Sequence, residues 1–232
     1  MNILAIDTST NVLGVGLANE EKIIGEYITN IKRNHSTRVL PAIDFLLRDV
    51  GYEMQDIDKI VVAEGPGSYT GLRIGVTIGK TLAWTLQIPI AGVSSLKAMA
   101  ANARYFTGYI APIMDARRGN IFTGLYQYVD DQLVQKIEDQ HTSAEEWAQN
   151  LKEMDRPILF IGNDLPLHKE TFQAILQENV RFASVPINNQ RPGELALLGK
   201  DEPEHDVHSF VPNYLRLAEA EAKWRERNQV QE

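Results

Sequence analysis

The chain contains no cysteine among its 232 residues. Disulfides, thiolate nucleophiles and Cys-ligated zinc or iron–sulfur centres are therefore excluded. Long apolar runs are also missing: segments such as 59–63 and 158–161 have the length of a strand, whereas a membrane span needs about 18 apolar residues. The sequence begins directly with an apolar strand pattern and has no basic, signal-like start. These absences predict a cytoplasmic protein without thiol chemistry.

Positive charge is also scarce, because 23 Lys and Arg face 31 Asp and Glu and leave a net charge of −8. A protein that binds nucleic acid by itself needs a basic surface to neutralise phosphates. Any contact with RNA is therefore expected to be shared with a more basic partner. The remaining composition, 44% hydrophobic and 23% charged, is typical of a globular protein with a buried core.

Strand and helix patterns occur in two similar series along the chain. In the first series, elements are expected at 3–7, 12–18, 23–28, 36–50, 59–63, 71–87, 90–93 and 94–105. In the second series, they are expected at 109–114, 120–128, 143–152, 157–161 and 165–177. We therefore predict an α/β protein of two related lobes, 1–104 and 105–211. The segment 200–208 is expected to be a linker or exposed loop, and a charged helix within 212–232 is expected to cross back to the first lobe.

The densest motif is G-P-G-S-Y-T-G-L-R-I-G at 65–75, between a strand and a helix. Such a loop could offer backbone N–H groups to an anion, but a tight turn with positive φ requires the same glycines. The turn is the favoured interpretation, because loops of this kind are common between elements. Named motifs fail here: a Walker A over 75–81 lacks its first glycine at Ile74, and a dinucleotide fingerprint lacks its third at Thr70. A hydrolase elbow around Ser68 lacks its glycines too.

The helix after this loop has Gly71, Gly75, Gly79 and Ala83 at every fourth position. Glycine inside a helix costs about 1 kcal/mol relative to alanine, so close packing against this bare face is expected to compensate. The rest of the helix is apolar as well, and a helix that is apolar all round has to be covered on both sides. The cover is either another subunit or this chain itself, and the sequence favours neither.

Candidate catalytic and metal-binding side chains are few. The five histidines are found at positions 35, 141, 168, 205 and 208. None of them pairs at helical spacing; His205 and His208 share an acidic loop, but two ligands do not make a metal site. His35 is expected to cap a helix or lie on the surface. Asp7 and Asp115 end apolar strands, where open α/β sheets place active-site carboxylates, and this favours a kinase-like ATP-dependent enzyme as one hypothesis.

Four motifs together resemble the TsaB family, also called YeaZ. They are I-D-T-S-T at 6–10, the glycine-rich loop at 65–75, M-D-A-R-R-G at 114–119 and P-N-Y-L-R at 212–216. The resemblance implies the actin-like ATPase fold, which is ribonuclease H-like and of the ASKHA type. That family shares this fold with TsaD, the bacterial subunit that transfers threonylcarbamoyl to the adenosine next to the anticodon of tRNA. The chain is thus expected to be a non-catalytic subunit that binds and supports TsaD.

A comparison with TsaD carries most of this expectation. In TsaD, a His-x-x-x-His pair just after a P-x-x-G-V segment holds the catalytic metal. Here P-I-A-G-V is present at 89–93, but Ser95 and Met99 stand where the resemblance would place the two histidines. A hydroxyl and a thioether cannot replace two imidazoles as ligands. The resemblance therefore implies neither a catalytic residue nor a metal site, although a glycoprotease-type peptidase of the same fold stays an alternative.

The resemblance also implies partners. TsaD is expected to bind the two first-lobe helices, 36–50 and 71–87. The expected interface residues are Val39, Ile43, Leu46, Leu47, Gly71, Gly75, Ile78, Gly79 and Leu82. The ATPase TsaE is expected to join the assembly, the chain to form a homodimer when TsaD is absent, and tRNA to be reached only through the complex. No intrinsic cofactor is implied, and ATP or ADP at the partner interface is an open alternative.

Overall fold

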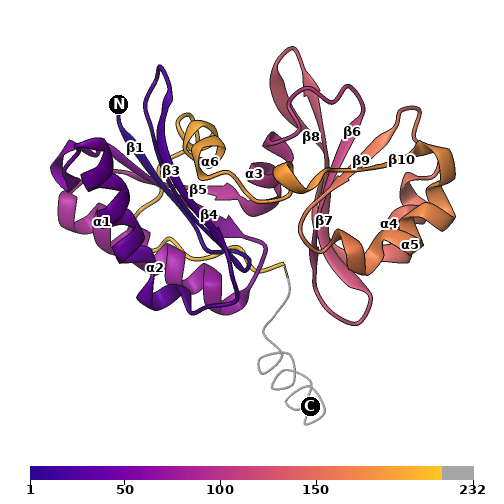
Figure 1. Cartoon of the computed structure of the whole chain (residues 1–232), viewed down its shortest axis with the longest axis horizontal. Helices are drawn as coiled ribbons and strands as arrows, with labels where there is room; N and C mark the ends of the chain where they lie inside the picture. The colour runs from indigo at the N-terminus through magenta and orange to yellow at the C-terminus, as the bar shows by residue number, and fades with distance from the viewer. Residues whose placement is uncertain (216–232) are drawn as a thin grey trace, which may run out of the picture.

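The structure is a computed structural model that describes residues 1–215. Two lobes lie side by side, each built on a five-stranded sheet (Figure 1). The strand order is β3-β2-β1-β4-β5 in the first sheet and β10-β9-β6-β7-β8 in the second. Both sheets combine an antiparallel hairpin with a parallel crossover, since β1 pairs antiparallel with β2 and parallel with β4, and β6 pairs in the same two ways with β7 and β9. The prediction of an α/β fold with two related lobes is confirmed.

The first lobe contains the elements expected from the sequence. These are β1 (Ile3–Asp7), β2 (Val12–Ala18), β3 (Ile23–Asn30), α1 (Val39–Val50), β4 (Lys59–Gly65), α2 (Tyr69–Leu86), β5 (Ile90–Ser94) and α3 (Ser95–Ala101). The helix α1 ends at Gly51, which adopts φ 74° as a left-handed cap. It begins three residues later than predicted, because Asn34 instead caps a short 3-10 turn, His35–Thr37.

The rest of the chain contains three elements that the sequence patterns did not predict. Its strands and helices are β6 (Tyr109–Asp115), β7 (Asn120–Val129), β8 (Gln132–Ser143), α4 (Ala144–Leu151), β9 (Ile158–Ile161), α5 (Leu165–Leu176) and β10 (Val180–Phe182), and α6 (Pro192–Gly199) follows them. Further 3-10 turns are Met54–Asp56, Gln177–Asn179 and Val185–Ile187. The unpredicted elements are β8, β10 and α6. No helix within residues 1–215 is both long and apolar enough to cross a membrane.

Helices cover both faces of each sheet (Figure 1). The outer faces are covered by α1 and α2 in the first lobe and by α4 and α5 in the second, while α3 and α6 lie between the two sheets. In α3, Leu96 and Met99 pack with second-lobe residues such as Ile110. Ala98 of the same helix packs with first-lobe residues such as Val61. The helix α3 is therefore shared by both lobes.

The chain returns to the first lobe before residue 192. Leu195 and Ala196 of α6 are fully buried against Ile3 and Ala5 of β1. The contact is tight, since a Cβ on Gly16 would lie 2.6 Å from the carbonyl carbon of Pro192. The predicted second-lobe boundary at residue 211 is therefore wrong, because the apolar residues of α6 cover the inner face of the first sheet.

Residues 202–215 form a strap that runs back along the first lobe. His205 N donates to Ile90 O at 2.9 Å, and Asn213 N donates to Glu64 O at 2.8 Å. The side chain of Lys80 on α2 fixes the strap from outside, because its Nζ donates to the carbonyl oxygens of His208 and Phe210. The segment 200–208, expected to be a linker or exposed loop, is thus tied to the first lobe by hydrogen bonds. The predicted charged helix beyond it lies outside the described residues.

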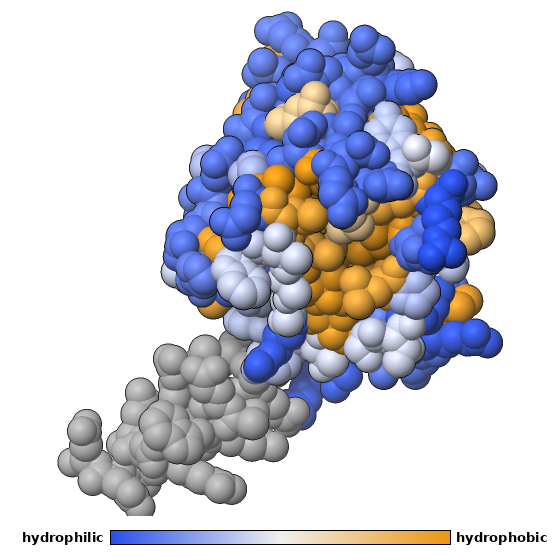
Figure 2. Space-filling view, turned by 90° about the vertical axis from the view of Figure 1, so that its left-hand side faces the viewer, coloured by the Kyte–Doolittle hydropathy of each residue, from blue (hydrophilic) through white to orange (hydrophobic). Residues whose placement is uncertain are grey.

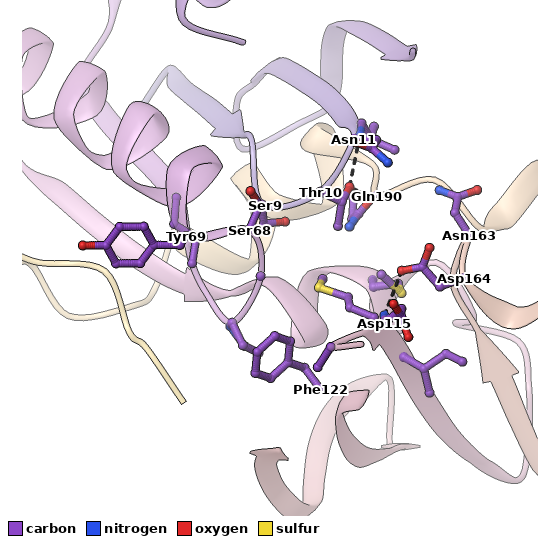
Figure 3. Close-up of a pocket in the computed structure, with 18 of the residues that line it drawn as sticks. Ser9, Thr10, Asn11, Ser68, Tyr69, Asp115, Phe122, Asn163, Asp164 and Gln190 are labelled. Atoms are coloured by element: carbon purple, nitrogen blue, oxygen red, sulfur yellow. Dashed lines mark hydrogen bonds between the residues drawn. The ribbon is translucent and has the colours of Figure 1, made fainter. Parts of the chain in front are cut away.

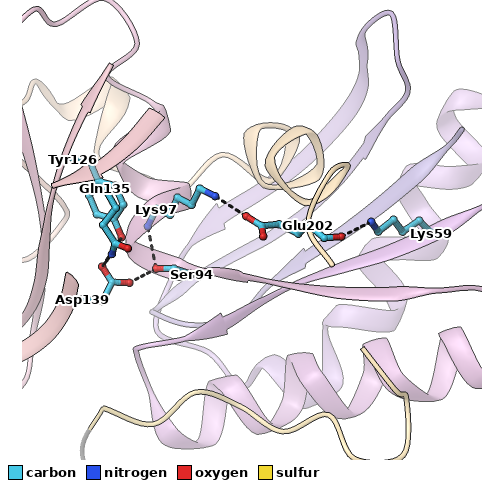
Figure 4. A network of polar contacts seen from close by, with 7 residues as sticks. All are labelled: Lys59, Ser94, Lys97, Tyr126, Gln135, Asp139 and Glu202. Carbon is cyan, nitrogen blue, oxygen red and sulfur yellow. Dashed lines mark hydrogen bonds and ion pairs between the residues drawn. The ribbon is translucent and has the colours of Figure 1, made fainter. Parts of the chain in front are cut away.

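One carboxylate joins the two lobes (Figure 4). Asp139 of β8 accepts hydrogen bonds from Ser94 at the end of β5, from the hydroxyl of Tyr126 and from Nε2 of Gln135. Ser94 also caps α3, since its Oγ accepts from the amides of Leu96 and Lys97. The junction between the lobes is therefore a specific polar contact as well as an apolar one.

Candidate functional site

A cleft of about 580 Å³ lies between the lobes (Figure 3). Its walls are the segments that follow β1 and β4 in the first lobe and β6 and β9 in the second. Each lobe thus contributes the carboxyl ends of a pair of parallel strands. Ligands of open α/β sheets bind at such strand ends. The cleft is therefore a candidate ligand site formed by both lobes.

Asp7 lies beneath the first-lobe wall of the cleft. Its Oδ1 accepts from Ser9 N at 2.8 Å and from Ser9 Oγ at 2.7 Å, while its Oδ2 is buried and has no partner among the described residues. Burial raises the pKa of Asp7, and the two hydrogen bonds from Ser9 offset only part of that rise. His35 lies nearby and is also buried. Its Nε2 donates a hydrogen bond to Thr10 O at 2.8 Å. The prediction that His35 is a cap or a surface residue is wrong.

The second-lobe wall holds a carboxylate that is oriented by a histidine. Oδ1 of Asp115 accepts from Nε2 of His168 at 3.0 Å, and the backbone N of Asp115 donates to Oδ2 of Asp164 at 2.8 Å. Asp115 and Asp164 both line the cleft, while His168 is buried behind them. The sequence patterns identified Asp115 but missed its two partners. Asp164 precedes α5 and His168 lies four residues further on, one helical turn away.

Gln190 is a further cleft residue that sequence reasoning missed. It is 1% exposed and lines the cleft next to Thr10. Its Oε1 accepts from Thr10 Oγ1 at 3.3 Å, whereas its Nε2 has no acceptor among the described residues. A buried amide donor that is left unpaired costs free energy. The first-lobe side of the cleft therefore holds an unpaired acceptor, Oδ2 of Asp7, and an unpaired donor, Nε2 of Gln190.

Ser95 and Met99, where the resemblance to TsaD would place two metal-binding histidines, lie in the core. Ser95 and Met99 are 0% and 1% exposed, on the helix that both lobes share. No group of three or more His, Cys, Asp or Glu side chains within residues 1–215 is arranged to hold a metal ion. His205, which the sequence analysis considered together with His208, stacks on the ring of Phe210 with the ring centroids 4.4 Å apart. Ser95 and Met99 are therefore core residues, and Met99 packs with side chains of the second lobe.

The glycine-rich loop has the geometry of a tight turn. Gly65 and Gly67 adopt φ 127° and 157°. A Cβ on Gly67 would lie 2.4 Å from Ser9 O, and one on Gly65 would lie 2.3 Å from Asn213 O. Ser68 then caps α2, because its Oγ accepts from Gly71 N at 3.2 Å. The conformation and close packing of the loop account for its glycines, as the favoured interpretation predicted.

Seven of the nine expected interface residues are buried in the first lobe. Val39, Ile43, Leu46 and Leu47 of α1 belong to its hydrophobic core, and Gly71, Gly75 and Gly79 of α2 are also buried. A Cβ would lie 2.4 Å from Oγ1 of Thr8 at Gly75 and 2.5 Å from Cγ1 of Val62 at Gly79. The glycine face of α2 therefore packs on the chain's own β-sheet, so these seven residues are wrong as surface contacts. Only Ile78 and Leu82 are partly exposed.

The outward surface of α1 and α2 is nevertheless apolar. Figure 2 shows hydrophobic residues gathered on this side of the molecule within a polar surround. The residues concerned are the exposed Leu40, Phe45 and Trp84 and the partly exposed Ile74, Ile78 and Leu82, which together we call the two-helix face. Apolar patches with a polar rim mark protein–protein interaction sites. The two helices predicted to bind a partner thus carry an apolar surface, although mostly through other residues.

The two lobes and the cleft between them define the chain as a protein of the actin-like ATPase fold. The solved structure described as YeaZ from Pseudomonas aeruginosa matches it with a TM-score of 0.78 and 24% identity, over 92% of this chain and 99% of that chain. A ROK hexokinase from Thermus thermophilus matches with a TM-score of 0.52 and 9% identity, over 85% of this chain and 98% of that chain. At these identities the likeness shows the fold alone.

Sequence comparisons identify the family. The family model described as TsaD, tRNA N6-adenosine threonylcarbamoyltransferase, matches residues 22–224. The tRNA threonylcarbamoyladenosine biosynthesis protein TsaB of Bacillus subtilis (strain 168) is 55% identical over 224 residues, 97% of this chain and 98% of the relative. The TsaB of Escherichia coli (strain K12) is 36% identical over 129 residues, 55% of each chain. The chain belongs to the TsaB (YeaZ) family, which confirms the resemblance seen in its motifs.

Proposed function

We propose that this chain acts in the synthesis of threonylcarbamoyladenosine in tRNA, as a non-catalytic subunit that binds and supports the transferase TsaD. The 55% identity to a TsaB over almost the full length of both chains carries the proposal. Its non-catalytic part is supported by Ser95 and Met99, which are buried where TsaD would have its metal-binding histidines. A serine and a methionine inside the core offer no open coordination position to a divalent ion.

The two-helix face is the proposed docking surface for TsaD. Its apolar side chains stand on two neighbouring helices, so one partner can cover them together. Phe45 and Trp84 are the aromatic members, and large aromatic side chains contribute most to interface affinity. The same apolar surface supports self-association when TsaD is absent.

We propose that TsaE is a further member of the assembly. We also propose that the chain has no intrinsic cofactor and that ATP or ADP, if present, would bind at the TsaD interface.

Charged substitutions on the two-helix face test this docking. Phe45→Glu and Leu40→Glu place a carboxylate on exposed positions of α1, so the chain should stay folded but lose capture by tagged TsaD by more than about tenfold. Leu167→Glu on α5 is the matched control, because Leu167 is equally exposed but belongs to the second lobe. Circular dichroism checks the fold of each variant. Equal capture of the α1 variants and the wild type would exclude this surface.

The non-catalytic role has its own test. The isolated chain is expected to form no threonylcarbamoyladenosine in tRNA, measured by mass spectrometry of digested nucleosides, and to retain no divalent metal after dialysis. Addition of TsaD should be required for product. Product formed by the isolated chain would reject the proposal.

A second candidate function is ATP-dependent, kinase-like catalysis in the interlobe cleft. The cleft favours it through Asp115, which His168 orients, and through the buried Asp7 behind the opposite wall. This reading requires the isolated chain to bind ATP with a micromolar dissociation constant, about 8 kcal/mol of binding free energy. Isothermal titration calorimetry decides between the two functions, since the non-catalytic subunit is expected to show no such heat.

A further inference from the structure

A solvent-facing pair of aromatic rings lies at the outer rim of the cleft. Tyr69 begins α2 and Tyr214 belongs to the strap, and their ring centroids are 5.0 Å apart with the planes tilted by 30°. The two residues are 43% and 37% exposed, and both line the cleft. Figure 3 shows Tyr69 directed outward, away from Asp115 and Asp164. The pair therefore presents stacking surface to the solvent outside the floor of the cleft.

Arg73 fixes the Tyr69 member of this aromatic pair. Its Nη1 donates to the hydroxyl of Tyr69 at 2.8 Å, and its guanidinium carbon lies 5.5 Å from the centroid of that ring. Arg73 is one helical turn after Tyr69, so the contact forms within α2 itself. No carboxylate within residues 1–215 pairs with Arg73, whose positive charge stays available to a ligand. The site is thus preorganised, because its rings and its cation are positioned before anything binds.

A second unpaired cation lies on the other side of the cleft. Arg117 follows β6, is exposed and lines the cleft, and makes no ion pair within residues 1–215. Three other arginines of this acidic chain pair with carboxylates instead: Arg48 with Asp44, Arg104 with Glu194 and Arg191 with Glu26. Free guanidinium groups are the ones that can bind phosphate bidentately. The rim is therefore locally suited to phosphate although the net charge of the chain is −8.

We propose that this rim binds a single-stranded segment of RNA, with a base stacked on Tyr69 and Tyr214 and with phosphates at Arg73 and Arg117. Proteins bind unpaired nucleotides by this combination of aromatic stacking and backbone cations. The inference rests on the proposed function, because tRNA modification is what supplies the RNA. It goes beyond the expectation that tRNA is reached only through the complex, since it gives this chain a contact of its own.

The charge distribution favours a strand of RNA over a free nucleotide in the cleft. The carboxylates of Asp115 and Asp164 line the interior and would face a triphosphate inserted there. The Arg73 guanidinium, in contrast, lies beside the aromatic pair at the rim. The Arg117 guanidinium belongs to the exposed turn after β6. A strand that crosses the rim brings its phosphates to the cations and keeps them away from the carboxylates.

Binding of an RNA stem-loop by the isolated full-length chain tests the inference. The probe is a fluorescently labelled tRNA anticodon stem-loop, and the measurement is fluorescence anisotropy at several salt concentrations. Tyr69→Ala and Tyr214→Ala should each weaken binding about tenfold, because each removes a stacking surface. Arg117→Ala should reduce the slope of log affinity against log salt by about 0.7. Tyr69→Phe, which keeps the ring but loses the hydrogen bond from Arg73, should bind more tightly than Tyr69→Ala and more weakly than the wild type.

Trp84→Ala is the matched control, since Trp84 is an equally exposed aromatic residue of α2 on the two-helix face. It should bind RNA normally and lose TsaD, whereas Tyr69→Ala should lose RNA and keep TsaD. Absence of binding by the wild type, equal binding by the tyrosine variants, or displacement of the RNA by an equal concentration of ATP would each overturn the inference. A chain that binds RNA through Tyr69 but never captures TsaD would instead refute the proposed function alone.

Discussion

At the scale of single residues, the glycines of α2 allow the helix to approach the first sheet closely. Gly71, Gly75 and Gly79 lie against Thr8 and Val62, where a side chain would collide with the neighbouring atoms. Glycine is costly in a helix interior, and the close contact between the helix and the sheet compensates for this cost. The spacing of the glycines correctly predicted a tightly packed face. Spacing alone contains no information on which surface packs there, so it left the choice between a partner and the chain itself open, and the first sheet fills that place in the structure.

The first prediction concerns Gly79. Gly79→Leu should lower the free energy of unfolding by at least about 1–3 kcal/mol, because its Cβ would already lie 2.5 Å from Cγ1 of Val62. Thr77→Leu, an exposed position of the same helix, should change stability by less than about 0.5 kcal/mol. Urea unfolding followed by circular dichroism measures both. Similar midpoints for the two variants would contradict the packing described here.

The second prediction concerns the buried carboxyl group of Asp7. Burial raises its pKa in the folded chain above the value in the unfolded chain, so the folded state holds the proton more tightly. The stability contribution of this group therefore increases as the pH falls through the folded pKa, and the ionised form destabilises the fold at higher pH. Asp7→Asn keeps an oxygen for the two Ser9 hydrogen bonds and removes the charge.

We therefore expect Asp7→Asn to be more stable than the wild type at about pH 8, with a difference that shrinks toward about pH 4. Urea unfolding across this range measures the difference. Glu64 and Asp139 also have pKa values raised by burial, so the variant should keep part of the pH dependence of the wild type. A constant difference at all pH values would show that the Asp7 charge is not responsible.

At the scale of elements, the strap of residues 202–215 depends on a few polar anchors. Lys80 of α2 donates to two of its carbonyl oxygens, and Lys59 of β4 donates to the carbonyl oxygens of Lys200 and Glu202. The side chain of Phe210, whose carbonyl is one of these acceptors, is buried in the first-lobe core. A charged donor on a backbone carbonyl contributes about 1.5–3 kcal/mol. The strap is thus held by side chains of the elements that it covers.

The third prediction follows for Lys80→Met, which keeps the length of the side chain and removes the charge. The amides of His205 and Asn213, which bond to Ile90 and Glu64, should exchange their hydrogens about tenfold faster or more. Lys152→Met on the exposed surface beyond α4 is the control and should change neither amide. Hydrogen exchange measured by NMR resolves the two positions. Unchanged exchange in the Lys80 variant would mean that the remaining contacts, including those of Phe210 and Lys59, hold the strap without Lys80.

Most elements could be predicted from sequence periodicity, and the exceptions have clear causes. The strand β8 is rich in polar residues, because it lies at the edge of the second sheet. The helix α6 begins with Pro192 and Gly193, which are typical of loops, and its apolar residues show no one-sided pattern because it lies between the two sheets. The strand β10 has only three residues. Tertiary environment determined these three elements more than local sequence did.

The site could be predicted only in part, for a related reason. Asp115 was predictable because it ends an apolar strand, but its hydrogen bond to His168 joins residues 53 positions apart. Gln190 lies 180 positions from Thr10, and no local pattern indicates that contact. The aromatic pair likewise joins Tyr69, the first residue of α2, to Tyr214 of the strap. Motifs located the walls of the cleft, and only the fold showed which side chains meet there.

At the scale of the whole molecule, the relative position of the lobes depends on the junction around Ser94. Its hydroxyl donates to Asp139 of the second lobe and accepts from the first amides of α3 (Figure 4). Asp139 also accepts from Tyr126 and Gln135, so its position is fixed within its own lobe. A single hydroxyl therefore connects the cap of a helix with the packing of one lobe against the other.

The fourth prediction compares two serine caps. Ser94→Ala and Ser68→Ala should each cost about 1 kcal/mol, because each removes the N-cap of a helix. Only Ser94→Ala should also change the distance between the lobes, since Ser68 makes no bond to the second lobe within residues 1–215. Small-angle X-ray scattering measures the radius of gyration of both. Identical scattering from the two variants would show that apolar packing around α3 alone sets the lobe arrangement.

The return of α6 and the strap to the first lobe has a consequence during synthesis on the ribosome. The strands β1 to β5 emerge early, yet the inner face of their sheet stays uncovered until Leu195 and Ala196 have been made. The second lobe, whose strands are contiguous between residues 109 and 182, has all its pieces before then. Domains generally fold as units once their sequence is complete, so the half of the molecule that is translated first is expected to be the last to finish folding.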